Sequence, residues 1–294
     1  MPPPTISSPQ RRLHRAIAVP RNESSELTRE PYSAKSKSSQ PRRSAPPLDR
    51  IETMTCALCR RDKPLQQSHI IPEFLYSALY DSLHRFEVLS SDPSKRRLSI
   101  QKGLRELLLC AECEVQLSRH ERYASLVFSG GVQPASTRTG NVVRLTGLDY
   151  SHFKLFGLSI LWRAAVSRHP MFKQVKLGQY EEPLRLLIHH DNPGPPGHYG
   201  FFLTALVHAA DLLPDLIVAP TRARLHNCIC YRFVFGGLVW IFFVSKHPVP
   251  LPLQQAFVNE EGEMSLLVSE LKDIKFLVAA VTDVLRSYRG QGAF

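Results

Sequence analysis

Two pairs of cysteines constrain the fold of this chain more than any other feature of its sequence. Two residues separate the cysteines within each pair, and 50 residues lie between the pairs, which are Cys56 with Cys59 and Cys110 with Cys113. A C-x-x-C turn presents two thiolates at a spacing that suits a tetrahedral ion, and four cysteine ligands are typical of structural zinc. We therefore predict one structural Zn²⁺ site built from these four residues.

The long segment between the pairs is compatible with such a site. Closing a loop of this length costs roughly 3.5 kcal/mol of chain entropy. Structural zinc contributes about 10–16 kcal/mol in small zinc-binding peptides, which exceeds that cost. Two alternatives remain open, namely four unrelated buried cysteines and redox-active dithiols, although no βαβ pattern surrounds either pair.

The sequence also indicates the environment of the protein. Its N-terminus has no apolar stretch of the kind found in secretory signals. We therefore expect a cytoplasmic, reducing environment, where paired cysteines bind metal more often than they form disulfides. The longest apolar run, residues 233–245, contains two glycines and is too short to cross a bilayer, so we expect no transmembrane segment and no membrane partner.

Composition divides the chain into three segments. Residues 1–51 are rich in Pro, Ser and Arg, and we expect this tail to be disordered because it cannot bury enough apolar surface to offset the cost of ordering. Residues 52–130 contain the paired cysteines, and residues 140–290 form a larger segment of unknown role. The tail could be an uninformative extension, a nucleic-acid-binding arm or a transit peptide, or translation could begin at Met54.

The pattern of apolar residues predicts an α+β fold, in which a zinc-binding domain precedes a larger α+β domain. In the first domain, residues 71–83 have helical spacing, and residues 111–128 predict a helix that leaves the second cysteine pair. In the second, residues 148–167 predict a helix capped by Asp149 or Ser151, and two apolar stretches in residues 227–245 predict a β-hairpin. We expect a core position for Trp162, Trp240, Cys228 and Cys230.

A second motif lies between the cysteine pairs. Nine residues after Cys59 the sequence reads Ser-His-Ile-Ile-Pro, from Ser68 to Pro72, and the second pair lies in Leu-Leu-Cys-x-x-Cys, which a predicted helix follows. This order of motifs resembles the HNH endonuclease family, and more narrowly the bacterial HNH-like proteins with a Ser-His-Ile-Ile-Pro motif. The resemblance covers residues 54–124, and residues 148–167 are similar, less specifically, to the accessory domain of those proteins.

The resemblance implies a fold, a reaction and roles for particular residues. Members of the family have a ββα-metal fold that holds one divalent ion, such as Mg²⁺, at the scissile phosphate of a nucleic acid. By position, His69 corresponds to the general base that activates water, and the paired cysteines correspond to a separate structural zinc site. A neutral imidazole, whose pKa is ordinarily about 6.5, is a suitable base at neutral pH.

The sequence departs from the family at two positions near this histidine. Ser68 stands where the family often has an Asp or His metal ligand, and Glu114 stands where it often has Asn or His. The following helix offers His120 and Glu121 as ligands for the catalytic ion. We favour Glu121, because Glu114 and Glu121 are seven residues apart and therefore share one face of a helix.

Roles other than catalysis remain open for His69. It could donate a hydrogen bond to the backbone of the first cysteine turn, cap the helix that follows Pro72, or replace a cysteine as a zinc ligand. The run His189-His190-Asp191 also contains metal-ligand residue types, but no partner is identifiable and we interpret it as part of a loop.

The charge of the chain favours a polyanionic partner. The net charge is +11, and the first 50 residues contribute more than half of it, with ten Lys/Arg and four Asp/Glu. This balance favours nucleic acid, and we expect DNA. Basic side chains near the candidate site could contact phosphates or could form an ordinary solvated run of charge; they are Lys95, Arg96, Arg97, Lys102, Arg105 and Arg119. No feature indicates an oligomeric state.

Two functional hypotheses follow from these features. The first is a metal-dependent endonuclease of the HNH type, which hydrolyses phosphodiester bonds in nucleic acid and carries a structural zinc ion. The second is a non-catalytic zinc-binding module that holds nucleic acid or a protein partner. The departures at Ser68 and Glu114 favour the second, because they remove ligands of the catalytic ion.

Overall fold

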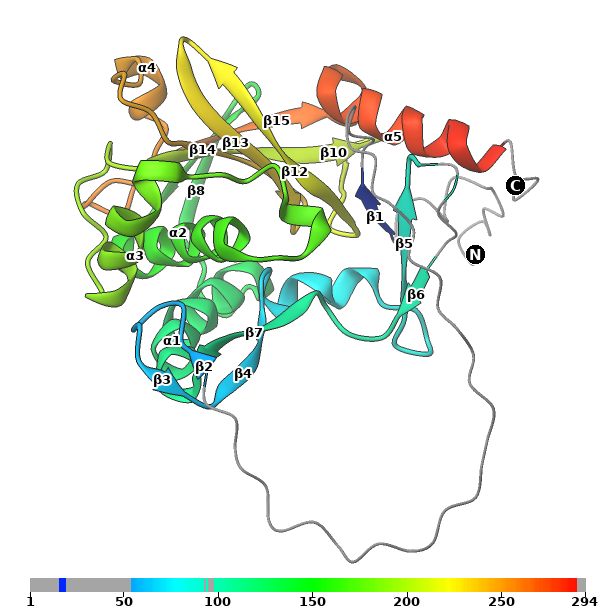
Figure 1. Cartoon of the computed structure of the whole chain (residues 1–294). Coiled ribbons are helices and arrows are strands. Elements are labelled where there is room, and N and C mark those ends of the chain that lie inside the picture. The colour runs from blue at the N-terminus through cyan, green and yellow to red at the C-terminus, as the bar shows by residue number, and fades with distance from the viewer. Residues whose placement is uncertain (1–15, 20–53, 93, 95–97, 290–294) are drawn as a thin grey trace, which may run out of the picture.

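A computed structural model describes residues 16–19, 54–92, 94 and 98–289 and shows a mixed α+β fold (Figure 1). In the described residues one large sheet contains the eleven strands β1 (Ala16–Val19), β5 (Phe86–Ser90), β6 (Leu98–Ile100), β8 (Ala135–Thr139), β9 (Val142–Thr146), β10 (Phe201–His208), β11 (Asp211–Leu212), β12 (Leu216–Leu225), β13 (Cys228–Phe235), β14 (Leu238–Phe243) and β15 (Met264–Glu270). Their order is β6-β5-β1-β12-β13-β14-β10-β15-β9-β8, with β11 paired to β10. Neighbours are antiparallel, except that β1 is parallel to β5 and β12, and β10 is parallel to β15.

Strand β1 comes from the tail that we predicted to be disordered. Its backbone pairs with β5 on one side and with β12 on the other, and so joins the β5–β6 hairpin of the cysteine segment (residues 52–130) to the sheet of the larger segment (residues 140–290). The structure differs from the prediction at Ala16–Val19, because the edges of β5 and β12 offer hydrogen-bond partners to the backbone groups on the two sides of this segment. The rest of residues 1–51 lies outside the described residues, as do Lys95, Arg96 and Arg97.

Helix α2 (Tyr150–Val166) is the buried centre of the fold, and every residue from 153 to 165 is buried. The predicted cap is confirmed at Asp149, whose carboxylate accepts a hydrogen bond from the His152 N–H at 2.8 Å. The helix approaches the sheet at Gly157, where an added Cβ would lie 2.8 Å from Cε1 of Phe201. A residue without a side chain is therefore needed at this contact.

The cysteine segment contains two further small strand pairs and helix α1. Strands β2 (Met54–Thr55) and β3 (Asp62–Lys63) form a hairpin, and β4 (Leu65–His69) pairs with β7 (Arg105–Cys110) in a separate antiparallel sheet. Helix α1 (Ala111–Ser129) begins directly after β7. The helix predicted over residues 71–83 is the shorter 3₁₀-helix η2 (Glu73–Leu79), because the backbone is extended at Tyr80 and then turns over residues 82–84.

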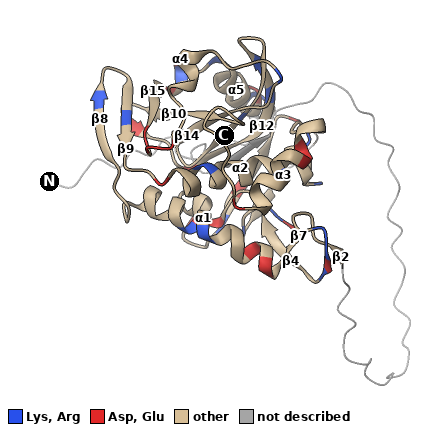
Figure 2. Ribbon diagram, turned by 90° about the vertical axis from the view of Figure 1, so that its left-hand side faces the viewer, with Lys and Arg blue, Asp and Glu red and all other residues tan. Residues whose placement is uncertain are grey.

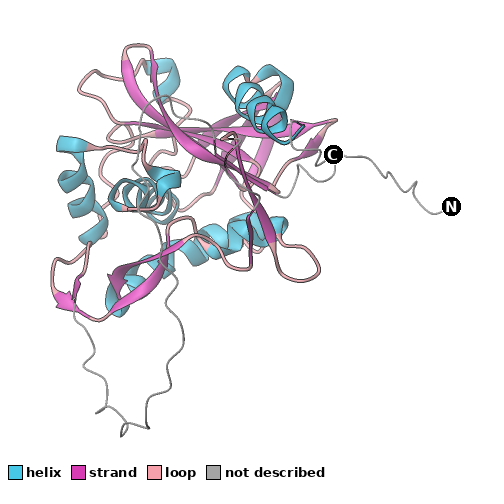
Figure 3. Cartoon of the chain, turned by 45° about the vertical axis from the view of Figure 1, so that its right-hand side comes forward, coloured by secondary structure: helices cyan, strands magenta, loops and turns pink. Residues whose placement is uncertain are grey.

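One hydrophobic core spans the two segments. It contains Ile70 and Leu117 from the cysteine segment together with Trp162 and Trp240, and both tryptophans were predicted to be buried. Cys228 and Cys230 lie in a smaller cluster, also as predicted. Helix α5 (Lys275–Arg289) packs on the opposite face of the sheet from α2 (Figure 3). No helix in the described part of the chain is long and apolar enough to cross a membrane.

We expect Gly157→Val to lower the free energy of unfolding by about 2–3 kcal/mol, because the new side chain would collide with the Phe201 ring inside a packed core. Urea unfolding followed by circular dichroism measures this change. The matched control is Ser151→Val at an exposed position of the same helix, where we expect a loss of about 0.5 kcal/mol or less. Equal losses in the two variants would contradict the close packing at Gly157.

Candidate functional site

Four thiols gather where the first cysteine turn meets the start of α1. The Sγ atoms of Cys56, Cys59, Cys110 and Cys113 all lie within 4.8 Å of one another, and those of Cys59 and Cys110 are 3.8 Å apart. In a tetrahedral site with Zn–S bonds of about 2.3 Å, the sulfur atoms are about 3.8 Å apart. The cluster could therefore hold a zinc ion. Within the described ranges it is the only group of three or more Cys, His, Asp or Glu side chains whose ligand atoms all lie close enough together to hold one ion.

Local backbone structure forms each half of the cluster. In the first turn, the Cys56 carbonyl accepts a hydrogen bond from the Arg60 N–H at 2.9 Å, and Arg60 has a positive φ of 61°. In the second, Cys110 is the N-cap of α1 and its N–H donates to Sγ of Cys56 at 3.3 Å. Burial and the neighbouring thiols raise the pKa of Cys113. A bound cation would favour the thiolate forms that this burial disfavours.

Helix α3 (Glu181–His189), from the larger segment, holds the first cysteine turn in place. The buried guanidinium of Arg185 donates to the carbonyl of Leu58, which lies between the two cysteines, and to both carboxylate oxygens of Glu182 at 2.8 and 2.6 Å. On α1, Nε2 of Gln116 donates to the Ile188 carbonyl at 3.0 Å. These hydrogen bonds fix α3 against both halves of the thiol cluster.

His69 ends strand β4 and contacts a carboxylate. Its Nε2 atom lies 2.8 Å from Oε2 of Glu73, in the first turn of η2. The other oxygen of Glu73 accepts a hydrogen bond from the Tyr80 hydroxyl at 2.5 Å, and the Gly103 N–H donates to Oε2 at 3.4 Å. The sequence did not indicate a role for Glu73, because four-residue spacing predicts a contact only when both residues lie in one helix.

Burial sets the protonation state of this histidine. Desolvation lowers the pKa of His69 below its ordinary value, the negative charge of Glu73 partly raises it, and the positive charge of Arg105 lowers it. The imidazole is therefore neutral at pH 7. The contact with Glu73 does not have hydrogen-bond geometry, but a negative charge 2.8 Å from Nε2 favours the tautomer with its proton on that nitrogen, which leaves a lone pair on Nδ1.

The contacts do not support two other roles considered for His69. It is not part of the thiol cluster, so it does not replace a cysteine as a zinc ligand. The N-cap of η2 is Pro72, and no side chain caps that helix.

Arg163 of α2 anchors the strand end that carries His69. Its guanidinium is 1% exposed, donates to the His69 carbonyl at 2.6 Å and lies 2.8 Å from Oε1 of Glu121. It also donates to the backbone and hydroxyl oxygens of Ser159, on its own helix. The charge of this buried arginine is thus balanced by Glu121, and β4 is tied to α2.

The two candidate ligands on α1 have different partners. Glu121 faces Arg163, whereas the buried His120 has Nε2 2.7 Å from Oδ1 of Asp191 and Nδ1 2.9 Å from Nδ1 of His152. The structure therefore does not bring His120 and Glu121 together around one ion. Asp191, which we interpreted as a loop residue, follows α3 and pairs with His120 through a contact that sequence spacing did not indicate.

Glu114 is on α1 and faces Ser68 of β4. Burial raises the pKa of its carboxyl, while a hydrogen bond with the Ser68 hydroxyl and the charge of Arg163 lower it. Its Oε1 atom has no hydrogen-bond partner within the described residues. Two carboxylates thus lie near one guanidinium, and no third ligand joins them in the described part of the chain. These donors do not fit the catalytic ion that the family resemblance implies.

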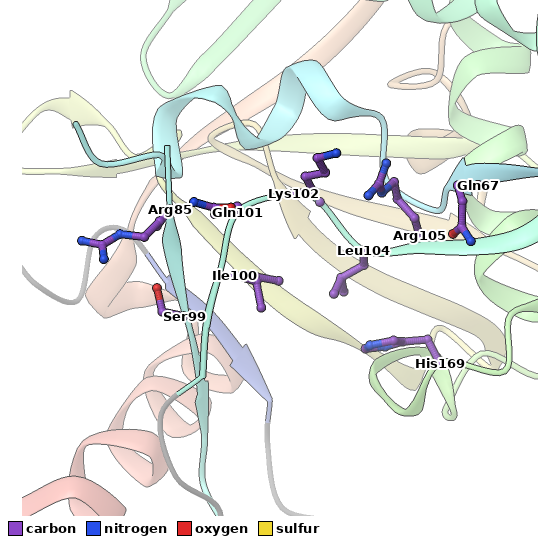
Figure 4. Close-up of a pocket in the computed structure, with 10 residues that line it drawn as sticks. Gln67, Arg85, Ser99, Ile100, Gln101, Lys102, Leu104, Arg105 and His169 are labelled. Atoms are coloured by element: carbon purple, nitrogen blue, oxygen red, sulfur yellow. The ribbon is translucent and has the colours of Figure 1, made fainter. Parts of the chain in front are cut away.

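A basic groove lies beside the β4–β7 pair (Figure 4). It has a volume of about 690 Å³, and its lining includes Lys102 and Arg105, two of the predicted phosphate contacts. Arg119 is not part of the lining; it is exposed on α1, along which charges of both signs lie (Figure 2). The lining also includes Arg85 and His169, which no motif indicated because they come from separate parts of the chain.

Comparisons with protein-family models, with curated proteins and with solved structures found no match for this chain. The resemblance to the HNH family therefore stays a prediction. The geometry itself consists of a four-cysteine cluster, a neutral histidine beside a carboxylate and a basic groove next to them.

We expect the purified protein to carry one zinc ion per chain, held by four thiolates. Cys113→Ser should release the ion and lower the melting temperature, because the metal joins the two cysteine turns. Mass spectrometry measures the zinc content. The thiolate-to-cobalt absorption of the Co²⁺-exchanged protein shows whether thiolates hold the ion. The control is Cys230→Ser, a buried cysteine outside the cluster, which should keep the metal. A protein without zinc, or zinc retained by Cys113→Ser, would rule the assignment out.

Proposed function

We propose that this chain hydrolyses phosphodiester bonds of nucleic acid as an endonuclease of the HNH type, with His69 as the general base. The observation that carries the proposal is the neutral imidazole of His69 at the end of an anchored strand. It lies against Glu73, and its strand borders a basic groove. A neutral base beside a surface suited to phosphate is the combination that this reaction requires.

The order of elements around His69 supports the comparison with that family. The antiparallel strands β4 and β7 precede α1, and the second cysteine pair lies at the junction of β7 and α1. His69 is on the first of the two strands, and the thiols form a separate cluster. The family resemblance implies this arrangement for a ββα unit with a structural zinc ion.

In the proposed reaction, Nδ1 of His69 accepts a proton from a water molecule whose oxygen attacks phosphorus. The new P–O bond forms as the bond to the leaving sugar oxygen breaks, and that oxygen takes a proton from solvent. Arg105, which is opposite His69 in the strand register, and Lys102 balance negative charge on the non-bridging oxygens. Glu73 keeps the ring proton on Nε2, so that Nδ1 stays available as the base.

The family resemblance also implies a divalent ion such as Mg²⁺, which would stabilise charge on the phosphate. The carboxylates on this side of α1 are Glu114 and Glu121, but Arg163 already lies against Glu121, and no third ligand is present among the described residues. No step of the proposed reaction therefore passes through such an ion. Dependence on Mg²⁺, Mn²⁺ or Ni²⁺ is a result to be measured.

A second candidate function is a non-catalytic zinc-binding module that holds nucleic acid or a protein partner. The contacts of Glu121 with Arg163 and of His120 with Asp191 favour it, because both candidate ion ligands are already engaged. In that case, His69 and Glu73 would join β4 to η2 without taking part in a reaction.

His69→Ala separates these two functions. We expect the variant to cleave supercoiled plasmid about 100-fold or more slowly than the wild type, because the general base is lost. Its zinc content and urea midpoint should match the wild type, since His69 is not in the thiol cluster. The control is His190→Ala, an exposed histidine outside the site, which should cleave normally.

The assay is run with Mg²⁺, Mn²⁺ and Ni²⁺ in turn and without added ion. Equal cleavage by His69→Ala and the wild type would remove His69 from the reaction. No cleavage of DNA or RNA by the wild type under any of these conditions would leave the binding module as the function.

The pH dependence of cleavage tests the role of Glu73. Activity should rise with pH as His69 loses its proton and reach a plateau by about pH 7, because burial lowers the pKa of His69. Glu73→Gln removes a charge that raises this pKa, so the rise should move to lower pH. The plateau rate should fall at least about tenfold, because the ring tautomer is no longer set. The control is Glu261→Gln at an exposed position. If cleavage by Glu73→Gln rose over the same pH range as cleavage by the wild type, an effect of Glu73 on the pKa of His69 would be excluded.

A further inference from the structure

We infer that the groove beside β4 and β7 binds the phosphodiester backbone of a nucleic-acid strand and leads that strand to His69. This inference rests on the proposed function for the class of its ligand. The groove has a volume of about 690 Å³, and its lining consists of Gln67 of β4, Arg85 directly before β5, the consecutive residues from Ser99 to Arg105, and His169 of the larger segment.

The charges of the lining suit a polyanion. Three of its side chains are cationic, Arg85, Lys102 and Arg105, and no carboxylate is among the lining residues. Arg85 is paired with Asp81 at 3.0 Å. By contrast, Lys102 and Arg105 have no salt bridge to a carboxylate in the parts of the chain that the structure describes. Two cations without an acidic partner, in a lining without acids, favour phosphate binding.

The uncharged part of the lining adds hydrogen-bond donors. His169 comes from the larger segment, and its Nδ1 accepts a hydrogen bond from the Met171 N–H at 3.2 Å. The proton of the neutral ring is therefore on Nε2, where it can be donated to a phosphate oxygen. Figure 4 shows His169 and Arg105 reaching the groove from different elements. The cysteine segment and the larger segment thus both contribute to this surface.

The register of the strand pair connects the groove to His69. In β4–β7, His69 is directly opposite Arg105, and Gln67 is two residues before His69 on the same strand. Side chains opposite each other share a face of the sheet, as do residues two apart along a strand. Gln67 and Arg105 line the groove, so His69 projects from the same face. A phosphate held by Arg105 is therefore next to the proposed base.

The size of the groove favours a nucleic-acid strand over a single small anion, because a volume of about 690 Å³ is far more than one phosphate group fills. Seven consecutive residues, from Ser99 to Arg105, form much of its lining. Within this segment Gly103 packs on η2, since an added Cβ would lie 2.7 Å from the Tyr76 ring and 3.0 Å from Oε2 of Glu73.

The experiment measures binding without cleavage. Zinc-loaded full-length protein carrying His69→Ala is titrated into fluorescein-labelled duplex DNA, single-stranded DNA and single-stranded RNA of one sequence, over a series of KCl concentrations. Lys102→Gln and Arg105→Gln are each added to this background. The matched control is Arg119→Gln, which removes an exposed basic residue outside the groove. Arg105→Lys keeps the charge and tests for rescue.

We expect both groove variants to weaken binding about fivefold or more and to reduce the slope of log affinity against log salt by about 1. Arg119→Gln should bind like the parent, and Arg105→Lys should restore most of the affinity. The probe that binds most tightly identifies DNA or RNA as the ligand. Zinc content and urea midpoints confirm that each variant is folded.

Two results would overturn the inference. The first is unchanged binding of all three probes by folded Lys102→Gln and Arg105→Gln. The second is an equal loss in Arg119→Gln, which would indicate a general effect of net charge. Plasmid cleavage by the wild type is scored separately, so groove-dependent binding without cleavage would retain the groove and reject His69 as a base.

Discussion

The meeting of two cysteine pairs at one point determines the geometry around His69. Cys110 is both a member of the thiol cluster and the last residue of β7, where it pairs with Leu65 of β4. From that pairing the two strands run antiparallel, through a one-residue register shift between Gln66 and Gln67, to His69 opposite Arg105. Because the side chains of a strand alternate, the register also places Ser68 on the face toward α1. The cluster therefore sets the position of the candidate base, although His69 binds no sulfur.

Two buried arginines of the larger segment hold this unit in place. Arg163 on α2 binds the His69 carbonyl, and Arg185 on α3 binds the Leu58 carbonyl. A buried guanidinium needs a counter-charge and several acceptors, and removing its partner typically costs about 3–5 kcal/mol. Here Glu121 and Glu182 supply the counter-charges. The larger segment thus has a structural role in the candidate site, whatever else it binds.

The charged groups on the two faces of β4 bear on the two functions considered. Desolvation and the charge of Arg105 lower the pKa of His69, whereas the charge of Glu73 raises it. The net effect is a lowered pKa, which leaves His69 as a neutral base at pH 7. On the other face of β4, Arg163 lies against a carboxylate that the sequence assigned to a catalytic ion. The first arrangement supports hydrolysis, and the second supports a module that only binds. A basic groove shared by both segments is compatible with either function.

Local spacing in the sequence was enough to predict several features. These include the four-cysteine cluster, the helix that leaves the second cysteine pair, the buried α2 with its cap at Asp149, and the burial of both tryptophans. Each follows from a turn, a periodicity or a capping preference that acts over a few residues. The folded chain alone shows that Ala16–Val19 joins the sheet, that His120 and Glu121 have separate partners, and that Glu73 and His169 lie near β4. Those contacts join different elements, and their geometry depends on how the shared core packs, which no local pattern encodes.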